Sequence, residues 1–439
     1  MRPVVTAGDI REMVRIRGES DGVMYEGAMH RTKSMSLDQI PSPPRADAWC
    51  KLISGHARSN VQWLLCAILC SVACGCGGGG GGGASYTPNN PPPANNPPPA
   101  PTTATLLAVT NATSGTIDML TIDTKTGAPK PIAGDPLPDG PTASAVAIDP
   151  QKRFLYVSST SGEVRGYLID PATLNLTPVS GSPFATSGQS VAIAIDPGGH
   201  FVLTANGSAN TLSVFTIGST TGTLTEAAGS PFAAGADPSA IVVTASHYVY
   251  AVNTAGRSVS AYSMDMTSGA LTPVVGSPFH ISGSPNGLVI DPAGTHIYTT
   301  ESQPNELSGF SIDAISGALT PISGSPFAAS YAIRSPVMDA KGQRLHAANG
   351  TDVDCFLVDS STAGLTEIGL SYTNGRAIAL ALDGPDDFLN VLDNVDNQVE
   401  VFAIDPTAGS LTLITGSPFA LFPGASSQAL GPNAIAVQH

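Results

Sequence analysis

A four-residue motif, Gly-Ser-Pro-Phe, recurs at nearly constant spacing through the C-terminal three quarters of the chain. Its copies start at Gly181, Gly229, Gly276, Gly324 and Gly416, and a weaker copy, Gly-Asp-Pro-Leu, starts at Gly134. The copies from Gly134 to Gly324 are 47, 48, 47 and 48 residues apart, and the last gap of 92 residues equals two periods of 46. One copy has therefore decayed, near Gly369, and the region holds seven units. Repeats of this length build architectures in which each unit packs on its neighbours.

Each unit predicts four short strands. An apolar run that ends in a turn comes first, as at residues 145–150 (AVAIDP), and an apolar second run follows at 154–159 (FLYVSS). The third run alternates, as at 211–217 (TLSVFTI), and the fourth follows a glycine turn, as at 222–227 (GTLTEA). Alternation indicates a half-exposed strand, and a continuous apolar run indicates burial near a central axis. Four antiparallel strands in such a repeat form one blade, so we expect an all-β, seven-bladed β-propeller.

The two ends of the repeat region contain complementary strands. The region opens at Thr103 with a second-strand sequence (TATLLAVTN) and finishes from Asn433 with a first-strand sequence (NAIAVQH). We therefore expect residues 103–439 to form the propeller, closed by a blade that the N- and C-terminal strands share. Such a blade leaves no open sheet edge at which other chains could pair.

Charge and cysteine content exclude several classes of protein. Residues 101–439 hold 10 Lys and Arg against 27 Asp and Glu, a net charge of −17, whereas residues 1–100 hold 9 against 7. A body this acidic repels phosphate polymers, so we expect no nucleic-acid partner. Only Cys355 lies in the repeats, which therefore contain no internal disulfide. Both tryptophans, Trp49 and Trp63, precede the repeats, which argues against WD-repeat and quinoprotein propellers.

The first hundred residues read as a targeting region and a tether. Residues 61–73 form an apolar run of 13 residues that follows basic residues and ends in small ones. This run is shorter than the roughly 20 residues that span a bilayer, and its layout is that of a signal peptide. It leads into Cys74 and Cys76, a sequence that resembles the lipobox at which bacterial lipoproteins are lipidated. We expect residues 61–76 to be a signal peptide with a lipobox-like end; plain secretion is the alternative.

The flanking segments have no expected fold. Residues 1–60 show no convincing periodicity and are interpreted as an N-terminal extension, which a start codon assigned too early would explain. Residues 77–102 contain a run of glycines and then repeated Asn and Pro, which predicts a flexible to extended linker. We therefore expect an exported protein, in the periplasm, at the outer membrane or on the cell surface, held to a membrane by its lipid anchor alone.

One face of the propeller is predicted to carry function. The Asp-Pro turn between the first and second strands and the glycine turn between the third and fourth repeat almost unchanged, and both lie on one face. Loops on the opposite face vary, and variation on a rigid scaffold is where binding usually occurs. Ionisable residues on the variable face are the candidates: Arg334 and Arg376 as catalytic residues, and Arg257, Glu301, Glu306, Asp352 and Asp393 as binding residues. Guanidinium groups beside carboxylates can bind an acid or stabilise an oxyanion; a solvated rim is the alternative.

The repeated residues themselves have structural interpretations. We expect the Asp of each Asp-Pro pair to cap its turn rather than bind calcium, and the motif phenylalanine to pack between blades. No metal or cofactor is expected.

The combined pattern of AIDPxGxxLYVxN, xxVSVFxID and TGALTPVxGSPF resembles the seven-bladed lactonase family. That family includes bacterial 6-phosphogluconolactonases and a fungal carboxymuconate cycloisomerase, and similar repeats occur in surface propellers of the YVTN type. Enzymatic members carry Gly-Pro-Arg-His before a first strand; Arg334 falls on the arginine, and Ser335 replaces the histidine. The resemblance implies a lactone hydrolase that uses Arg334 and Arg376. The replacement favours a monomeric surface propeller that binds a protein or carbohydrate on its variable face.

Overall fold

The computed structural model describes residues 105–112, 114–140, 142–373, 375–384, 387–421 and 434–438. The predicted extension (1–60), signal peptide (61–76) and linker (77–102), with Cys74 and Cys76, lie outside the described residues. Within the described residues, no helix is both long and apolar enough to cross a membrane.

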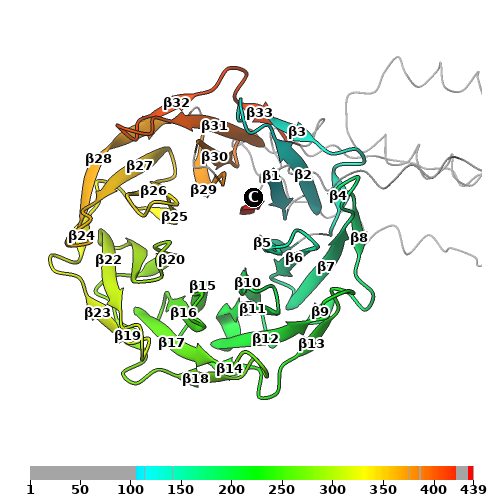
Figure 1. Cartoon of the computed structure of the whole chain (residues 1–439), viewed down its shortest axis with the longest axis horizontal. Helices are drawn as coiled ribbons and strands as arrows, with labels where there is room; N and C mark the ends of the chain where they lie inside the picture. The colour runs from blue at the N-terminus through cyan, green and yellow to red at the C-terminus, as the bar shows by residue number, and fades with distance from the viewer. Residues whose placement is uncertain are drawn as a thin grey trace, which may run out of the picture. The chain divides into compact units, whose positions relative to one another are not determined.

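Seven antiparallel sheets stand around a common axis, as the sequence predicts (Figure 1). We number these blades 1 to 7 by the order of their second strands. The innermost strands are β34 (Ala434–Gln438), β5 (Ala143–Ile148), β10 (Ser190–Ile195), β15 (Pro238–Val243), β20 (Pro285–Ile290), β25 (Arg334–Met338) and β29 (Ala377–Leu382). The second strands are β1 (Thr105–Asn111), β6 (Phe154–Ser159), β11 (Phe201–Asn206), β16 (Tyr248–Asn253), β21 (His296–Ser302), β26 (Arg344–Ala348) and β30 (Phe388–Asp393).

The fourth strand is the shortest of the four in every blade except blade 6. The third strands are β2 (Thr116–Ile122), β7 (Glu163–Ile169), β12 (Thr211–Ile217), β17 (Ser258–Met264), β22 (Asn305–Ile312), β27 (Asp352–Val358) and β31 (Gln398–Ile404). The fourth strands are β3 (Pro129–Pro131), β8 (Leu176–Pro178), β13 (Leu224–Glu226), β18 (Leu271–Pro273), β23 (Leu319–Pro321), β28 (Leu365–Tyr372) and β32 (Leu411–Leu413). Six blades add a two-residue strand in the repeated motif: β4 (Leu137–Pro138), β9 (Phe184–Ala185), β14 (Phe232–Ala233), β19 (Phe279–His280), β24 (Phe327–Ala328) and β33 (Phe419–Ala420). A short 3₁₀ helix, η2 (Gly207–Ala209), follows β11.

Blade 1 combines strands from distant parts of the sequence. β34 pairs antiparallel with β1, so that Ala436 lies opposite Ala108. Ile435 and Val437 of β34 pack against the apolar cluster that blades 7 and 1 share. The sheet order β3-β2-β1-β34 therefore places a C-terminal strand in the innermost position.

The serine of the motif completes the hydrogen bonding of the third strand. In blade 4 the fourth strand covers only Tyr262 to Met264, and the N–H of Ala261 donates instead to the Ser277 hydroxyl at 2.9 Å. Blades 2, 3, 5 and 7 repeat this contact, and in blade 1 the Asp135 carboxylate accepts from the N–H of Met119. Because a buried unpaired N–H is costly, the hydroxyl explains why serine recurs in the motif.

Contacts between blades explain the repeated glycine turn. The ring of Phe154 in blade 2 lies against Gly222 in the turn of blade 3, where an added Cβ would come within 2.6 Å of it. Tyr156 donates its hydroxyl to the Gly222 carbonyl at 2.7 Å, and Tyr298 donates likewise to Ala363 of blade 6 at 2.8 Å. The second strands of blades 2 and 5 thus hold the outer turn of the next blade.

Candidate ligand-binding site

The register of the sheets places the predicted site residues at one end of the blades. In blade 6 Arg334, the first residue of β25, pairs with Ala348, the last residue of β26. Innermost strands therefore begin on the face where second strands turn into third strands. The candidate residues all lie at this end: Arg257, Glu301, Glu306, Arg334, Asp352, Arg376 and Asp393.

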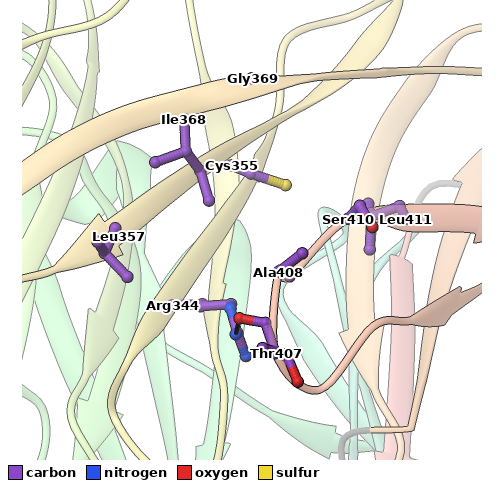
Figure 2. Close-up of a pocket in the computed structure, with 10 residues that line it drawn as sticks. Arg344, Cys355, Leu357, Ile368, Gly369, Thr407, Ala408, Ser410 and Leu411 are labelled. Carbon is purple, nitrogen blue, oxygen red and sulfur yellow. Dashed lines mark hydrogen bonds between the residues drawn. The ribbon is translucent and has the colours of Figure 1, made fainter.

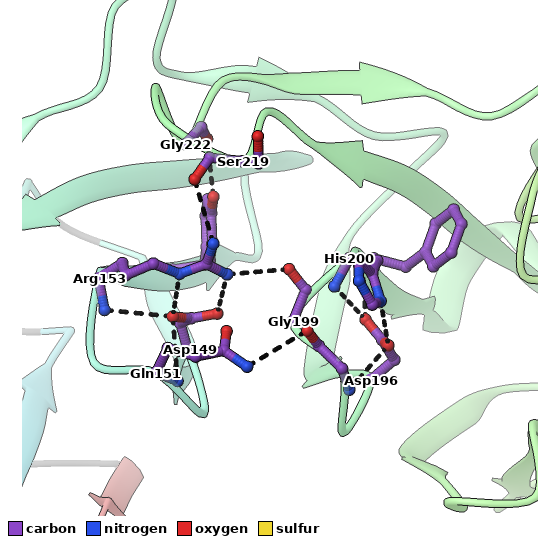
Figure 3. A network of polar contacts seen from close by, with 11 residues as sticks. Asp149, Gln151, Arg153, Asp196, Gly199, His200, Ser219 and Gly222 are labelled. Atoms are coloured by element: carbon purple, nitrogen blue, oxygen red, sulfur yellow. Dashed lines mark hydrogen bonds and ion pairs between the residues drawn. The ribbon is translucent and has the colours of Figure 1, made fainter.

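The opposite face consists of turns that hold one another. Asp149 accepts two hydrogen bonds from Arg153, each of 2.8 Å, and Arg153 also donates to the carbonyls of Gly199 and Ser219 in blade 3 (Figure 3). Asp196 caps its own turn by accepting from the backbone N–H of residues 198, 200 and 201. These aspartates act as turn caps. No cluster of three or more His, Cys, Asp or Glu that could hold a metal ion occurs in the described part of the chain.

The arginines of the propeller divide into two groups. Arg153 pairs with Asp149, Arg165 with Asp139 and Glu163, and Arg344 with Asp339 at 3.8 Å. The other three, Arg257, Arg334 and Arg376, form no ion pair with any described residue. Positive groups without a partner are unusual on a body of net charge −17, and they lie on the variable face.

Arg334 and Arg376 mark the starts of neighbouring innermost strands. Arg334 opens β25, Arg376 directly precedes β29, and these two strands lie side by side near the axis (Figure 1). Arg376 is exposed. Arg334 is half-buried, and its Nε atom is buried without a hydrogen-bond partner among the described residues. The structure therefore places the two arginines that the sequence singled out as catalytic at the starts of neighbouring strands on one face.

Ser335 has a structural role. It stands at the position where enzymatic members of the seven-bladed lactonase family carry histidine. The register of β25 shifts between Arg334 and Val337, and Ser335 adopts a φ of +48°. Its hydroxyl accepts a hydrogen bond from the Leu380 N–H of β29 at 3.1 Å. A bulge of this kind re-aims side chains at a strand end, and here it ties blade 6 to blade 7.

Glu301 is buried beside a second carboxylate. It accepts hydrogen bonds from the Gly283 N–H at 3.0 Å and from the Thr299 hydroxyl at 3.3 Å. Burial is the main reason that the pKa of Glu301 rises from 4.5 to about 7; a hydrogen bond from Ser308 opposes the rise and Glu306 adds to it. Glu306, directly opposite on β22, is half-buried and accepts from the Ser282 hydroxyl.

Asp393 and Asp352 organise loops on the same face. Asp393 is buried and accepts from the N–H groups of Arg376 and Val395 and from the Gln398 amide. Asp352 is half-buried in the β26–β27 turn, where its oxygen accepts from the Thr351 hydroxyl at 3.0 Å. Contact of these two carboxylates with a ligand stays a prediction, as it does for Glu301, Glu306 and Arg257.

Sequence reasoning missed a set of buried carboxylates on third strands. Asp118, Asp354 and Glu400 are at most 1 % exposed. Burial raises the pKa of Asp354 to about 6, and the Asn349 amide donates to it at 2.8 Å. The missed signal was a charged residue at a position where blades 3 to 5 have serine.

The fold and the repeat define a class, the seven-bladed β-propellers. The sequence profile described as "Lactonase, 7-bladed beta-propeller" matches residues 103–231 and 223–333, more than half of the chain. The chain therefore belongs to the seven-bladed lactonase family, as the repeat pattern predicts. No curated protein matches it in sequence.

Solved structures share the fold at low sequence identity. A putative 6-phosphogluconolactonase from Bacteroides uniformis is 19 % identical with a TM-score of 0.66, covering 76 % of this chain and 99 % of that one. A putative 6-phosphogluconolactonase from Bacteroides fragilis is 17 % identical with a TM-score of 0.66, covering 77 % and 100 %. The periplasmic gluconolactonase of Pseudomonas aeruginosa is 17 % identical with a TM-score of 0.64, covering 77 % and 99 %. These likenesses concern the fold alone.

Proposed function

We propose that the protein is an exported, lipid-anchored binding propeller whose variable face recognises a carboxylate-bearing carbohydrate through Arg334 and Arg376. The observation that carries the proposal is the pair of guanidinium groups at the starts of β25 and β29, neither of which has an ion-pair partner among the described residues. A carboxylate accepts two parallel hydrogen bonds from a guanidinium, and such charge-assisted bonds are about twice as strong as neutral ones. A protein that presents an acidic group is the alternative partner.

The electrostatics of the propeller support a local site rather than a general affinity for anions. The net charge of −17 repels anions at long range, so binding requires close contact with the unpaired arginines. Half-burial of Arg334 removes competing water from part of its guanidinium, which strengthens a charged hydrogen bond there. We therefore expect short-range recognition of a single carboxylate.

The sequence supports the proposed location. The apolar run at 61–73 and the cysteines at 74 and 76 follow the order of a lipoprotein signal, and the glycine- and proline-rich residues 77–102 would hold the propeller away from a membrane. Acyl mass on the N-terminal peptide of the mature protein from its native host would support lipidation. Recovery of an unprocessed 1–76 segment would contradict both lipidation and secretion.

Calorimetric titration with galacturonate, a simple carboxylate sugar, tests the binding function. We expect saturable binding that Arg334→Gln and Arg376→Gln each weaken by about 10- to 100-fold, because one charged hydrogen bond contributes roughly 1.5–3 kcal/mol. Lys341→Gln is the matched control, since it removes the same charge from an exposed turn on the opposite face. Equal loss in the control, or no saturable binding of any acidic sugar, would contradict the proposal.

Membership of the lactonase family favours a second candidate, hydrolysis of a lactone at the same two arginines. In that case the guanidinium groups stabilise the oxyanion, and losing one donor lowers the rate by about 10²–10³. A pH-stat assay with a panel of sugar lactones separates the two functions. Turnover that Arg334→Gln abolishes and Lys341→Gln preserves would establish the hydrolase; binding without turnover would establish the binding propeller.

A further inference from the structure

The repeated phenylalanine fills the gap between one blade and the next in five places. The five residues are Phe184, Phe232, Phe279, Phe327 and Phe419. Phe327, for example, pairs with Leu307 of its own blade and packs in a cluster with Phe356 and Ala363 of blade 6. The ring therefore belongs to the packing between blades, as the sequence predicted.

Blade 6 lacks this ring because β28 takes the place of the motif. β28 runs on to Tyr372 along the whole of β27, so that Ser371 pairs with Val353 in the position that Phe327 has opposite Leu307. A cavity of about 420 Å³ lies between blades 6 and 7. In Figure 2 the side chains of blade 6 stand on one side of it and the turn at residues 407–411 of blade 7 stands on the other.

A second gap supports the same explanation for the cavity. In blade 1 the motif has Leu137 instead of phenylalanine, and a smaller cavity of about 240 Å³ lies beside it. Asn175 and Leu176 line that cavity, and they hold the same positions in blade 2 as Ser410 and Leu411 hold in blade 7. The cavity beside blade 6, where Ser371 stands at the position of the ring, is larger than the cavity beside blade 1, where Leu137 does. The cavity in blade 6 therefore occupies the place of a missing ring.

The walls of the larger cavity combine apolar surface with a hydrogen-bonded arginine. Ile368 is 44 % exposed because a bulge pairs Cys355 with Gly369 and skips it, whereas Ile322 at the same position of blade 5 is 5 % exposed. Arg344 is 8 % exposed, and its Nε atom is buried and closed off from the cavity. A terminal nitrogen of its guanidinium, Nη2, donates to the carbonyls of residues 406 and 407, at 3.2 and 2.8 Å.

We propose that this cavity is a binding site for a small, uncharged, single-ring aromatic molecule. The ring takes the place of the missing phenylalanine. An uncharged ligand fits because Asp339 already balances the charge of Arg344 at 3.8 Å. The volume lies within the range of small-molecule sites and exceeds the roughly 150 Å³ that holds benzene in an engineered cavity. The site is distinct from the arginine pair on the variable face.

Fluorine NMR of 4-fluorophenol with the full-length protein tests the site. We expect saturable broadening of the fluorine signal, weakened at least about 10-fold by Ser371→Phe, which supplies the ring from the chain itself. Ala408→Phe blocks the mouth from blade 7 and should weaken binding equally. Ser268→Phe is the matched control, because residue 268 has the same turn position in blade 4, facing the gap that Phe232 fills.

Three results would overturn the proposal. A response that does not saturate, or that survives both Ser371→Phe and Ala408→Phe in folded protein, would overturn the site, as would equal loss in Ser268→Phe.

Discussion

Replacing Glu301 by glutamine tests how blade 5 holds the loop that leads into its innermost strand. The buried carboxylate accepts from the Gly283 N–H of that loop and from the Thr299 hydroxyl. Asn206 and Asn253 hold the corresponding positions in blades 3 and 4, so an amide fits the same geometry. Glu301→Gln therefore keeps an acceptor for these donors and removes the titration.

The sign of the effect follows from the pKa. The pKa of Glu301 is about 7 in the folded protein against an ordinary value of 4.5, so the folded state binds more protons between these pH values. The free energy of unfolding of the wild type therefore falls as pH rises through this window. Integrated over about 2.5 pH units at about 1.36 kcal/mol per unit, the loss reaches at most about 3–4 kcal/mol. Glutamine does not titrate, so the free energy of unfolding of Glu301→Gln does not fall for this reason.

Denaturant unfolding of both proteins at pH 4.5, 6 and 8 measures the effect. Relative to the wild type, Glu301→Gln should become more stable as pH rises, with most of the change complete above pH 7. Glu226→Gln, which alters an exposed glutamate of β13, should show no such trend. A stability difference that stays constant with pH, or that changes in the opposite direction, would refute the reasoning.

One deletion and two further substitutions test the packing of the blades. Deleting residues 434–439 should lower the free energy of unfolding by about 3–5 kcal/mol, because two half-buried apolar side chains and a strand are lost, and an unchanged thermal melt would argue against the shared blade. Tyr298→Phe should cost about 1–3 kcal/mol by leaving the Ala363 carbonyl without its donor, and a neutral result in denaturant unfolding would show that water replaces the hydroxyl. Ser277→Ala should cost a similar amount by orphaning the Ala261 N–H, whose faster hydrogen exchange would report the lost bond.

The repeat made the architecture predictable because its markers perform the packing. Seven units, four strands in each and the inter-blade position of the phenylalanine all follow from residues that recur in the sequence. The face that carries the candidate residues was equally predictable, since strand order alone decides at which end Arg334 and Arg376 lie. The bulge at Ser335 could not be predicted, because a register shift depends on pairing with β26 rather than on local sequence.

Burial of the acidic candidates also escaped prediction, for a physical reason. Glu301 and Asp393 lie at the ends of second strands or one residue before, where polar residues usually meet solvent, yet the loop that enters each blade crosses directly over them. Gly283 and Gly375 allow this crossing, because an added Cβ at either position would overlap the carboxylate below. The extension of β28 could not be predicted either. The sequence showed that the motif is lost near Gly369, but not that an extended fourth strand replaces it.

A double-mutant cycle on the two arginines tests the central claim most directly. Calorimetry gives the dissociation constant for galacturonate of the wild type, Arg334→Gln, Arg376→Gln and the double variant. If both guanidinium groups contact one carboxylate, the two losses are not additive, and the coupling free energy should reach about 1 kcal/mol or more. Losses that add within about 0.3 kcal/mol would show that the arginines act independently, and unchanged affinity in the double variant would place the ligand elsewhere.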